Sequence, residues 1–207
     1  MSDIPNITQM SKAIRDMARE AIQSLPENSL AAKIARDSIV RPIVYMRCAE
    51  FYAVLRALNI TPEMRILDAS SPQWFSIYLA RSFPACQFHY CNIVDSELES
   101  YKLLSNQLGI TNLEYHKEDL RNLSFSTDSF DKVISISVIE HVYPEQGGDY
   151  SALQEITRVL KPKGEVVLTI PYKDTKNIVY VNGKVHERDV SKKISMRENT
   201  TKRCSIN

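Results

Sequence analysis

Four polar residues of this chain stand just after short apolar runs, and their types suit the binding of a small charged ligand. They are Asp68, Asn92, Asp119 and His141. A carboxylate accepts hydrogen bonds and favours a cationic ligand, whereas an amide oxygen accepts a hydrogen bond without the assistance of charge. An imidazole can act as a general base near neutral pH. The residue types therefore predict a ligand site with His141 as its candidate base, although this histidine could also be only part of a pocket wall.

The segments around these residues alternate between strand and helix patterns from Met64 onward. Apolar strand runs cover residues 64–69, 87–92, 112–116, 131–137 and 165–170, and helical patterns cover 74–82, 96–108 and 149–160. Apolar strands with helices between them are typical of a parallel sheet covered on both faces. Right-handed crossovers place the carboxyl ends of such strands at one edge. The sequence thus predicts a doubly wound α/β fold with a mainly parallel sheet, and the four polar residues converge at one edge of it.

The turn that follows Asp68 contains no glycine. A strand, a tight turn and a helix are the usual setting for a nucleotide-like ligand, and such turns are glycine-rich because glycine reaches positive φ freely. All five glycines of the chain come after residue 108. A nicotinamide-dependent oxidoreductase, which needs Gly-x-Gly-x-x-Gly after its first strand, is therefore a poor match. We expect the backbone of this turn to avoid positive φ and the hydroxyls of Ser70 and Ser71 to replace some backbone contacts with the ligand.

Both ends of the chain differ from the alternating core at residues 61–172. Helical patterns over 8–25, 29–38 and 42–58 predict an N-terminal helical extension over residues 1–60. The C-terminal segment, 173–207, begins with a predicted hairpin at 177–185 that turns at Asn182-Gly183. Its remainder is polar and predicts no strand that completes the sheet. An unpaired sheet edge favours a homodimer or indicates a truncated domain.

The composition of the chain favours an ordinary globular protein. The 207 residues are 43% hydrophobic and 25% charged with a net charge of +1, which gives no electrostatic footprint for nucleic acid or an anionic membrane. No apolar run approaches a membrane span, and the N-terminus lacks the pattern of a signal peptide. The four cysteines form no Cys-x-x-Cys pair, and His89, His116 and His186 show no ligand spacing. These features predict free thiols, no metal site and a cytoplasmic protein.

Six segments between residues 64 and 172 carry a recognisable series of motifs. They are Ile66-Leu67-Asp68, Phe88-His89-Tyr90-Cys91-Asn92, Lys117-Glu118-Asp119-Leu120, Ser129-Phe130-Asp131-Lys132-Val133, Glu140-His141-Val142 and Glu155-Ile156-Thr157-Arg158-Val159-Leu160-Lys161-Pro162-Lys163-Gly164. In this order they resemble the class I S-adenosylmethionine-dependent methyltransferases, the small-molecule type 11 group in particular. The resemblance implies a Rossmann-like methyltransferase fold, S-adenosylmethionine as cofactor and a small-molecule methyl acceptor.

The resemblance also implies roles for individual residues. Asp68 matches an acid near the methionine moiety of the cofactor, and the alternative is that it caps the following helix. Asp119 matches an acid that accepts a hydrogen bond from the adenine amino group, and Leu120 would pack on the ring; otherwise Asp119 is a solvated loop charge. His141 follows the fourth strand, where acceptor substrates lie in the family.

Two departures from the family pattern concern the cofactor. Ser70, Pro72 and Trp74 stand nearest the positions of three family glycines. Asn92 stands where an acid usually binds the ribose hydroxyls, and the nearby Asp95 could take that role or lie just outside a helix capping box.

Methyl transfer from a sulfonium is a direct displacement that needs orientation and the exclusion of water but no covalent nucleophile or metal. The sequence therefore predicts methyl transfer from S-adenosylmethionine to an unidentified small molecule, with the helical extension as a lid or as a cover for the sheet. The alternative is a non-catalytic domain of the same fold that serves as a binding or scaffolding module.

Overall fold

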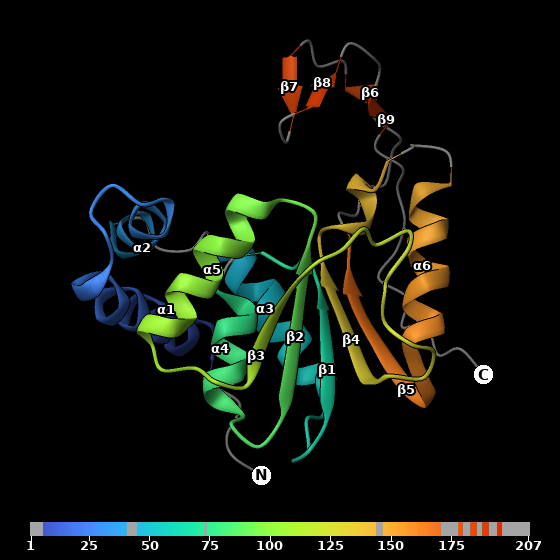
Figure 1. Ribbon diagram of the computed structural model, residues 1–207, viewed down its shortest axis with the longest axis horizontal. Helices are drawn as coiled ribbons and strands as arrows, with labels where there is room; N and C mark the ends of the chain where they lie inside the picture. Colours follow the sequence, from blue (N-terminus) through green and yellow to red (C-terminus); the bar gives the residue numbers. More distant parts are fainter. Residues whose placement is uncertain are drawn as a thin grey trace.

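The computed structural model describes residues 6–40, 45–72, 74–143 and 147–170, together with the backbone of four short strands beyond residue 177. Its centre is a five-stranded parallel sheet in the order β3-β2-β1-β4-β5 (Figure 1). The strands are β1 (Arg65–Ala69), β2 (Gln87–Asn92), β3 (Leu113–Lys117), β4 (Phe130–Ile136) and β5 (Leu160–Thr169). The predicted doubly wound parallel sheet is confirmed, and the chain reverses its direction of strand addition between β1 and β4.

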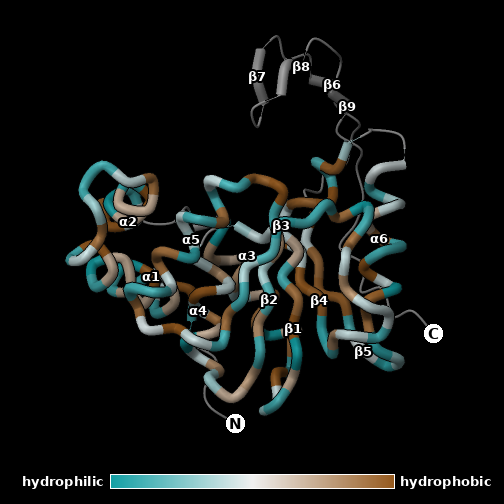
Figure 2. The backbone as a smooth tube through the Cα atoms, viewed as in Figure 1, coloured by the Kyte–Doolittle hydropathy of each residue, from teal (hydrophilic) through white to brown (hydrophobic). Residues whose placement is uncertain are grey.

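Each face of the sheet carries its own hydrophobic core, because successive side chains of a strand point to opposite faces. Ile66 of β1 belongs to a core shared with α4 (Phe75–Ser82) and α5 (Asp95–Gln107), whereas the next residue, Leu67, belongs to a core shared with α6 (Gly148–Val159). Figure 1 shows α6 on the opposite side of the sheet from α4 and α5. Figure 2 shows hydrophobic residues concentrated along β1 and β4, the strands at the middle of the sheet. Burial on both faces explains why these strands are apolar without alternation.

The N-terminal extension consists of α1 (Ile7–Ala21), a 3₁₀ turn η1 (Ile22–Ser24), α2 (Leu30–Val40) and α3 (Tyr45–Leu58). The first helix begins with a reciprocal capping box between Asn6 and Gln9. Its buried stripe, which includes Met10 and Ile14, belongs to the same core as α4 and α5. The ring of Phe51 in α3 stacks on Phe75 in α4, with centroids 4.7 Å apart. The extension is therefore packed against one face of the core. Of the helices that the structure describes, none combines the length and hydropathy that crossing a membrane requires.

The connection between β3 and β4, residues 118–129, contains no helix and runs over the face that α6 covers in part. Arg158 of α6 fixes this connection by donating hydrogen bonds to the carbonyl oxygens of Phe125 and Leu123, both at 2.8 Å. Glu155 adds to it by accepting from the backbone N–H of Leu123 at 2.8 Å and by pairing with Arg158. The two charged residues of the predicted α6 motif thus stabilise the loop that leads from Asp119 back to the sheet.

The predicted hairpin at 177–185 is wrong. Backbone pairing instead joins β6 (Ile178–Val179) to β9 (Ile194–Ser195) and β7 (Gly183–Val185) to β8 (Arg188–Val190), so Gly183 begins a strand. An Asn-Gly turn is a local signal, and here the strands before and after it pair with segments farther along the chain instead of with each other. Asn182 itself lies outside the described residues. None of these four short strands joins the five-stranded sheet.

Candidate functional site

Asp68 lies at the carboxyl end of β1, beside the point where the order of the strands reverses. Its side chain is buried, and its carboxylate accepts hydrogen bonds from the backbone N–H of Ser71 at 2.9 Å and from the hydroxyl of Ser76 in α4. Burial raises the pKa of the Asp68 carboxyl to about 6, although the hydrogen bonds from Ser71 and Ser76 oppose this rise. The carboxylate therefore joins β1 to the turn and to the first part of α4, and it retains acceptor capacity for a ligand.

The backbone of the turn after Asp68 enters the left-handed region twice, with φ of 64° at Ser70 and 75° at Trp74. The expectation that a turn without glycine avoids positive φ is thus wrong. Side-chain contacts stabilise both residues. The Ser70 hydroxyl donates to the carbonyl oxygen of Cys91 at 2.7 Å, and the buried indole of Trp74 donates to the hydroxyl of Ser38 in α2 at 2.8 Å. Two of the three positions that match family glycines therefore keep a conformation typical of glycine.

Ser71 links the turn to the strands on either side of β1. Its buried hydroxyl accepts a hydrogen bond from the backbone N–H of Ile136 in β4 at 3.1 Å. Its carbonyl oxygen accepts one from the hydroxyl of Tyr90 in β2 at 3.3 Å. The hydroxyls of Ser70 and Ser71 are thus engaged within the protein, where they fix the turn between β2 and β4.

Asn92 ends β2 and orients a carboxylate that the sequence analysis did not identify. Its amide nitrogen donates to the carboxylate of Glu97 at 2.9 Å, and its amide oxygen accepts from the backbone N–H of Val94 at 3.0 Å. Glu97 lies in the first turn of α5, which begins at Asp95 and has no side-chain cap, so the predicted capping box is wrong. Asp95 forms an ion pair with Lys117 at 2.5 Å instead. Glu97 is consequently the acid that lies beside Asn92 at the end of β2.

Asp119 and Leu120 follow β3 but have different surroundings. The Asp119 carboxylate pairs with Arg121, whose guanidinium also donates to the carbonyl oxygen of Tyr143 at 2.7 Å. Asp119 is partly exposed, with 32% of its side chain accessible. Leu120 is buried in the core that also contains Leu67. Arg121 therefore ties the loop after β3 to the segment after β4, a connection that no motif in the sequence indicated.

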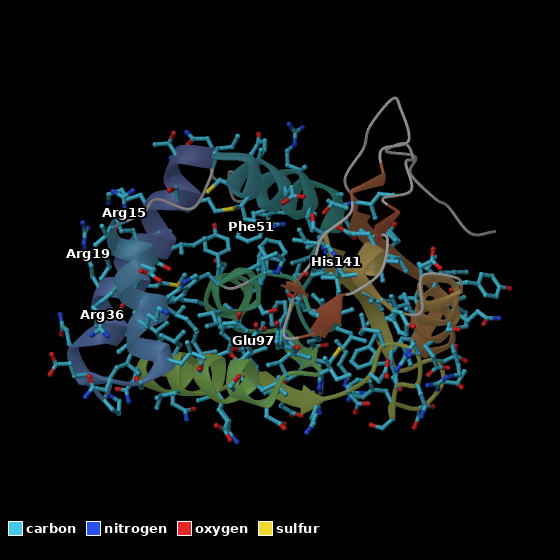
Figure 3. The ribbon with its side chains drawn as sticks, turned by 90° about the horizontal axis from the view of Figure 1, so that it is seen from above. Arg15, Arg19, Arg36, Phe51, Glu97 and His141 are labelled. Atoms are coloured by element: carbon cyan, nitrogen blue, oxygen red, sulfur yellow. The ribbon has the colours of Figure 1, made fainter. Side chains whose placement is uncertain are left out.

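His141 lies in the 3₁₀ turn η2 (Ile139–His141) after β4, with 51% of its side chain exposed. Its Nε2 atom is 3.9 Å from the Glu140 carboxylate. Burial raises the pKa of Glu140, and the charge of Glu50 raises it further. Figure 3 shows His141, Glu97 and Phe51, which come from η2, α5 and α3, between the pair of helices α1 and α2 and helix α6.

Glu50 of α3 reaches the carboxyl ends of β4 and β5. Its carboxylate accepts hydrogen bonds from the hydroxyls of Ser137 at 2.7 Å and Thr169 at 3.4 Å and pairs with Arg47 at 2.7 Å. Glu50 could not be recognised from the sequence because it lies outside the apolar stripe of its helix. Its only signal in the sequence was its place in the N-terminal extension. If that extension is a lid, it lies at the carboxyl edge of the sheet. The structure therefore gathers carboxylates from α3, η2 and α5 around the turn after β1.

Comparison with known proteins identifies this arrangement. Residues 67–168 match the model of a family described as a methyltransferase domain. The chain is 32% identical over 117 residues to a glycine/sarcosine/dimethylglycine N-methyltransferase of Actinopolyspora halophila, a match that covers 55% of this chain and 20% of that protein. It is 39% identical over 90 residues to a sterol 24-C-methyltransferase of Pneumocystis carinii, a match that covers 39% of this chain and 23% of that protein. The solved structure of the YcgJ protein of Bacillus subtilis superposes with a TM-score of 0.54 at 19% identity, over 60% of this chain and 51% of that one, which shows the shared fold.

The region from residue 67 to residue 168 is therefore a class I S-adenosylmethionine-dependent methyltransferase domain, and the cofactor that such a domain implies is S-adenosylmethionine. The chain spans about a fifth of the length of the curated relatives it matches.

Proposed function

We propose that the protein transfers the methyl group of S-adenosylmethionine to a small-molecule acceptor. The observation that carries this proposal is the turn after β1, which keeps left-handed backbone at Ser70 and Trp74 although it has no glycine. A non-glycine residue in this region costs about 1–3 kcal/mol. Close approach of the backbone to a cofactor at a strand-order reversal requires such a shape, which gives this cost a functional reason.

The cofactor would lie along the carboxyl ends of β1, β2 and β3. The buried Asp68 and the backbone of the turn would face its methionine portion, and the residues after β3, Asp119 and Leu120, would face the adenine. Glu97, oriented by the amide of Asn92, would accept hydrogen bonds from the ribose hydroxyls with the charge assistance that the amide alone lacks. The hydroxyls of Ser70 and Ser71 would act indirectly, by holding the turn in place.

The acceptor would lie on the side of Glu50, Glu140 and His141. The bound cofactor supplies an electrophilic methyl carbon on a sulfonium, so the protein needs to orient a nucleophile in line with it and to remove a proton where the nucleophile is protonated. The neighbouring carboxylates of Glu50 and Glu140 suit a cationic amine, and the exposed imidazole of His141 suits proton removal. An amine acceptor would agree with the relative that methylates glycine and sarcosine.

A second candidate function, a binding or scaffolding module without catalysis, is favoured by one observation. The side chains of Ser70, Ser71 and Asn92 all form hydrogen bonds within the protein, so the turn needs no ligand to satisfy them.

Calorimetric titration with S-adenosylhomocysteine tests the first function. We expect one-to-one binding that Glu97→Gln weakens about tenfold, as expected for loss of a charged hydrogen-bond acceptor. Glu99→Gln, an exposed position on the same helix, should leave the affinity unchanged. Lack of binding at millimolar ligand would overturn both the cofactor site and the methyltransferase proposal. Tight binding without turnover of any tested small amine would favour the non-catalytic module.

A further inference from the structure

Three side chains that could ligate a metal converge on the face of the sheet that α6 covers in part. His89 comes from β2, and Glu114 and His116 come from β3. The parallel register pairs His89 directly with Glu114, and two residues along β3 bring His116 onto the same face. The expectation that no histidines have ligand spacing is therefore wrong, because the spacing arises between two strands and not within one segment.

The ligand atoms already stand close to the separations found around a metal ion. His89 Nδ1 is 2.9 Å from His116 Nε2, and the Glu114 carboxylate is 3.5 Å from the first atom and 3.6 Å from the second. Bonds of about 2.0–2.2 Å in a tetrahedral site place neighbouring ligand atoms about 3.4 Å apart. Small side-chain adjustments would therefore bring all three ligands onto one ion.

We propose that His89, Glu114 and His116 bind a divalent transition-metal ion, with zinc as the best match, and leave its fourth position open to solvent. Two imidazoles and one carboxylate suit zinc and its neighbours in the first transition row, whereas calcium and magnesium prefer oxygen ligands alone. The 61% exposure of the Glu114 side chain gives an ion a path from solvent. The ring of Phe125 lies edge-on to His116, with centroids 5.0 Å apart, and forms an apolar wall.

Two acidic residues beside the histidines give this face a charge that suits a cation. Burial lowers the pKa of both imidazoles, that of His89 to about 4. The charges of Glu114 and Glu118 act in the opposite direction on His116 and would attract a cation.

Arg65 is the one nearby group among the described residues that opposes an ion. Its Nε–H donates to His89 Nε2 at 3.3 Å, and its guanidinium lies over the ring of Phe130, 5.2 Å from the centroid. Coordination through Nδ1 requires the His89 proton on Nε2, which then faces the Arg65 N–H. The exposed Arg65 side chain must therefore turn away when the ion binds, and its removal should increase the affinity.

Binding at this site would join the edge strand β3 to β2. Phe125 also connects the site to the loop that carries Asp119 and Leu120, so the ion would stabilise the adenine side of the proposed cofactor site without taking part in chemistry. The site itself does not depend on the proposed function, since its three ligands lie apart from the turn after β1.

Titration of the full, chelator-treated chain with Zn²⁺ by calorimetry tests this proposal. We expect one-to-one binding, weakened more than about tenfold by Glu114→Gln and by His116→Gln and strengthened several-fold by Arg65→Met, because even outer-shell partners change affinity about 10–100-fold. His141→Gln, which removes an exposed histidine elsewhere, should bind as the wild type does. The exposed Glu114 keeps the test interpretable if a histidine variant fails to fold.

The alternative is a histidine pair joined only by the hydrogen bond between His89 and His116. In that case Zn²⁺ would not bind one-to-one, or it would bind equally to the wild type and to Glu114→Gln, and either result would overturn the proposal. Titration with Co²⁺ gives a second readout. An absorption band typical of cobalt–thiolate ligation would assign binding to a cysteine and would also overturn it.

Discussion

Substitution of Ser70 by glycine and by alanine separates backbone strain from hydrogen bonding in the turn after β1. Both changes remove the hydroxyl that donates to Cys91, a loss of about 1 kcal/mol in the free energy of unfolding. Alanine keeps the strain of φ at 64°, whereas glycine relieves about 1–2 kcal/mol of it. Glycine also gives the unfolded chain about 0.4–1 kcal/mol of extra conformational entropy. The balance predicts that Ser70→Gly is about 0.5–1 kcal/mol more stable than Ser70→Ala.

Urea unfolding followed by circular dichroism measures this difference, provided that the two variants share one m value. The exposed Ser96 in α5 is the matched control, because glycine in a helix costs about 1 kcal/mol relative to alanine. The order of stability should therefore reverse between position 70 and position 96. If Ser70→Gly were less stable than Ser70→Ala, as expected at position 96, the turn would not be strained at Ser70. The inference of a cofactor-shaped turn would then lose its support.

Three further predictions concern the pH dependence of stability and the loop after β3. The pKa of Asp68 is higher in the folded protein than its ordinary value of 3.8, so the protonated carboxyl favours folding. This stabilisation is lost as the pH rises from about 4 through about 6. Asp68→Asn should abolish that part of the pH dependence of the free energy of unfolding, measured by urea titration. The pKa of His89 is lowered from 6.5 to about 4 in the folded protein, so its contribution to stability is lost as the pH falls through that range. His89→Gln should reduce this loss. If the variant loses stability between pH 6.5 and about 4 as the wild type does, the assignment to His89 is wrong. Arg158→Ala should destabilise the protein by about 2 kcal/mol, because it leaves the carbonyl oxygens of Leu123 and Phe125 without their donor. Arg36→Ala provides the comparison in the same thermal or urea assay, because it removes a hydrogen bond to the carbonyl oxygen of Glu27 at an exposed position, where water can replace the donor.

The fold followed from the sequence because its signals are local. Apolar runs mark strands that are buried on both faces, and the predicted bounds of the second strand, 87–92, are those of β2. The shared edge of their carboxyl ends then follows from right-handed crossovers. Asp68 and Asn92 could be placed at that edge for the same reason.

The details of the site did not follow, because they depend on side chains distant in sequence. Glu97 becomes a binding candidate only when Asn92 is seen to orient it, and Glu50 only when α3 is seen to reach Ser137. His89 and His116 are separated by 27 residues and meet through the register of β2 and β3. The positive φ at Ser70 and Trp74 was hidden because glycine, its usual sequence marker, is absent.

Some of the contacts that support the turn without glycine come from the N-terminal extension, whereas those of Ser70 and Ser71 come from the sheet. The Trp74 indole is held by Ser38 of α2, and the next residue, Phe75, stacks on Phe51 of α3. A glycine turn reaches the same backbone conformation without outside support. Here the strained junction between the turn and α4 depends on two helices that precede the sheet. Loss of the extension should therefore affect the cofactor site as well as the core, which gives the helices a role that neither a lid nor a simple cover of the sheet describes.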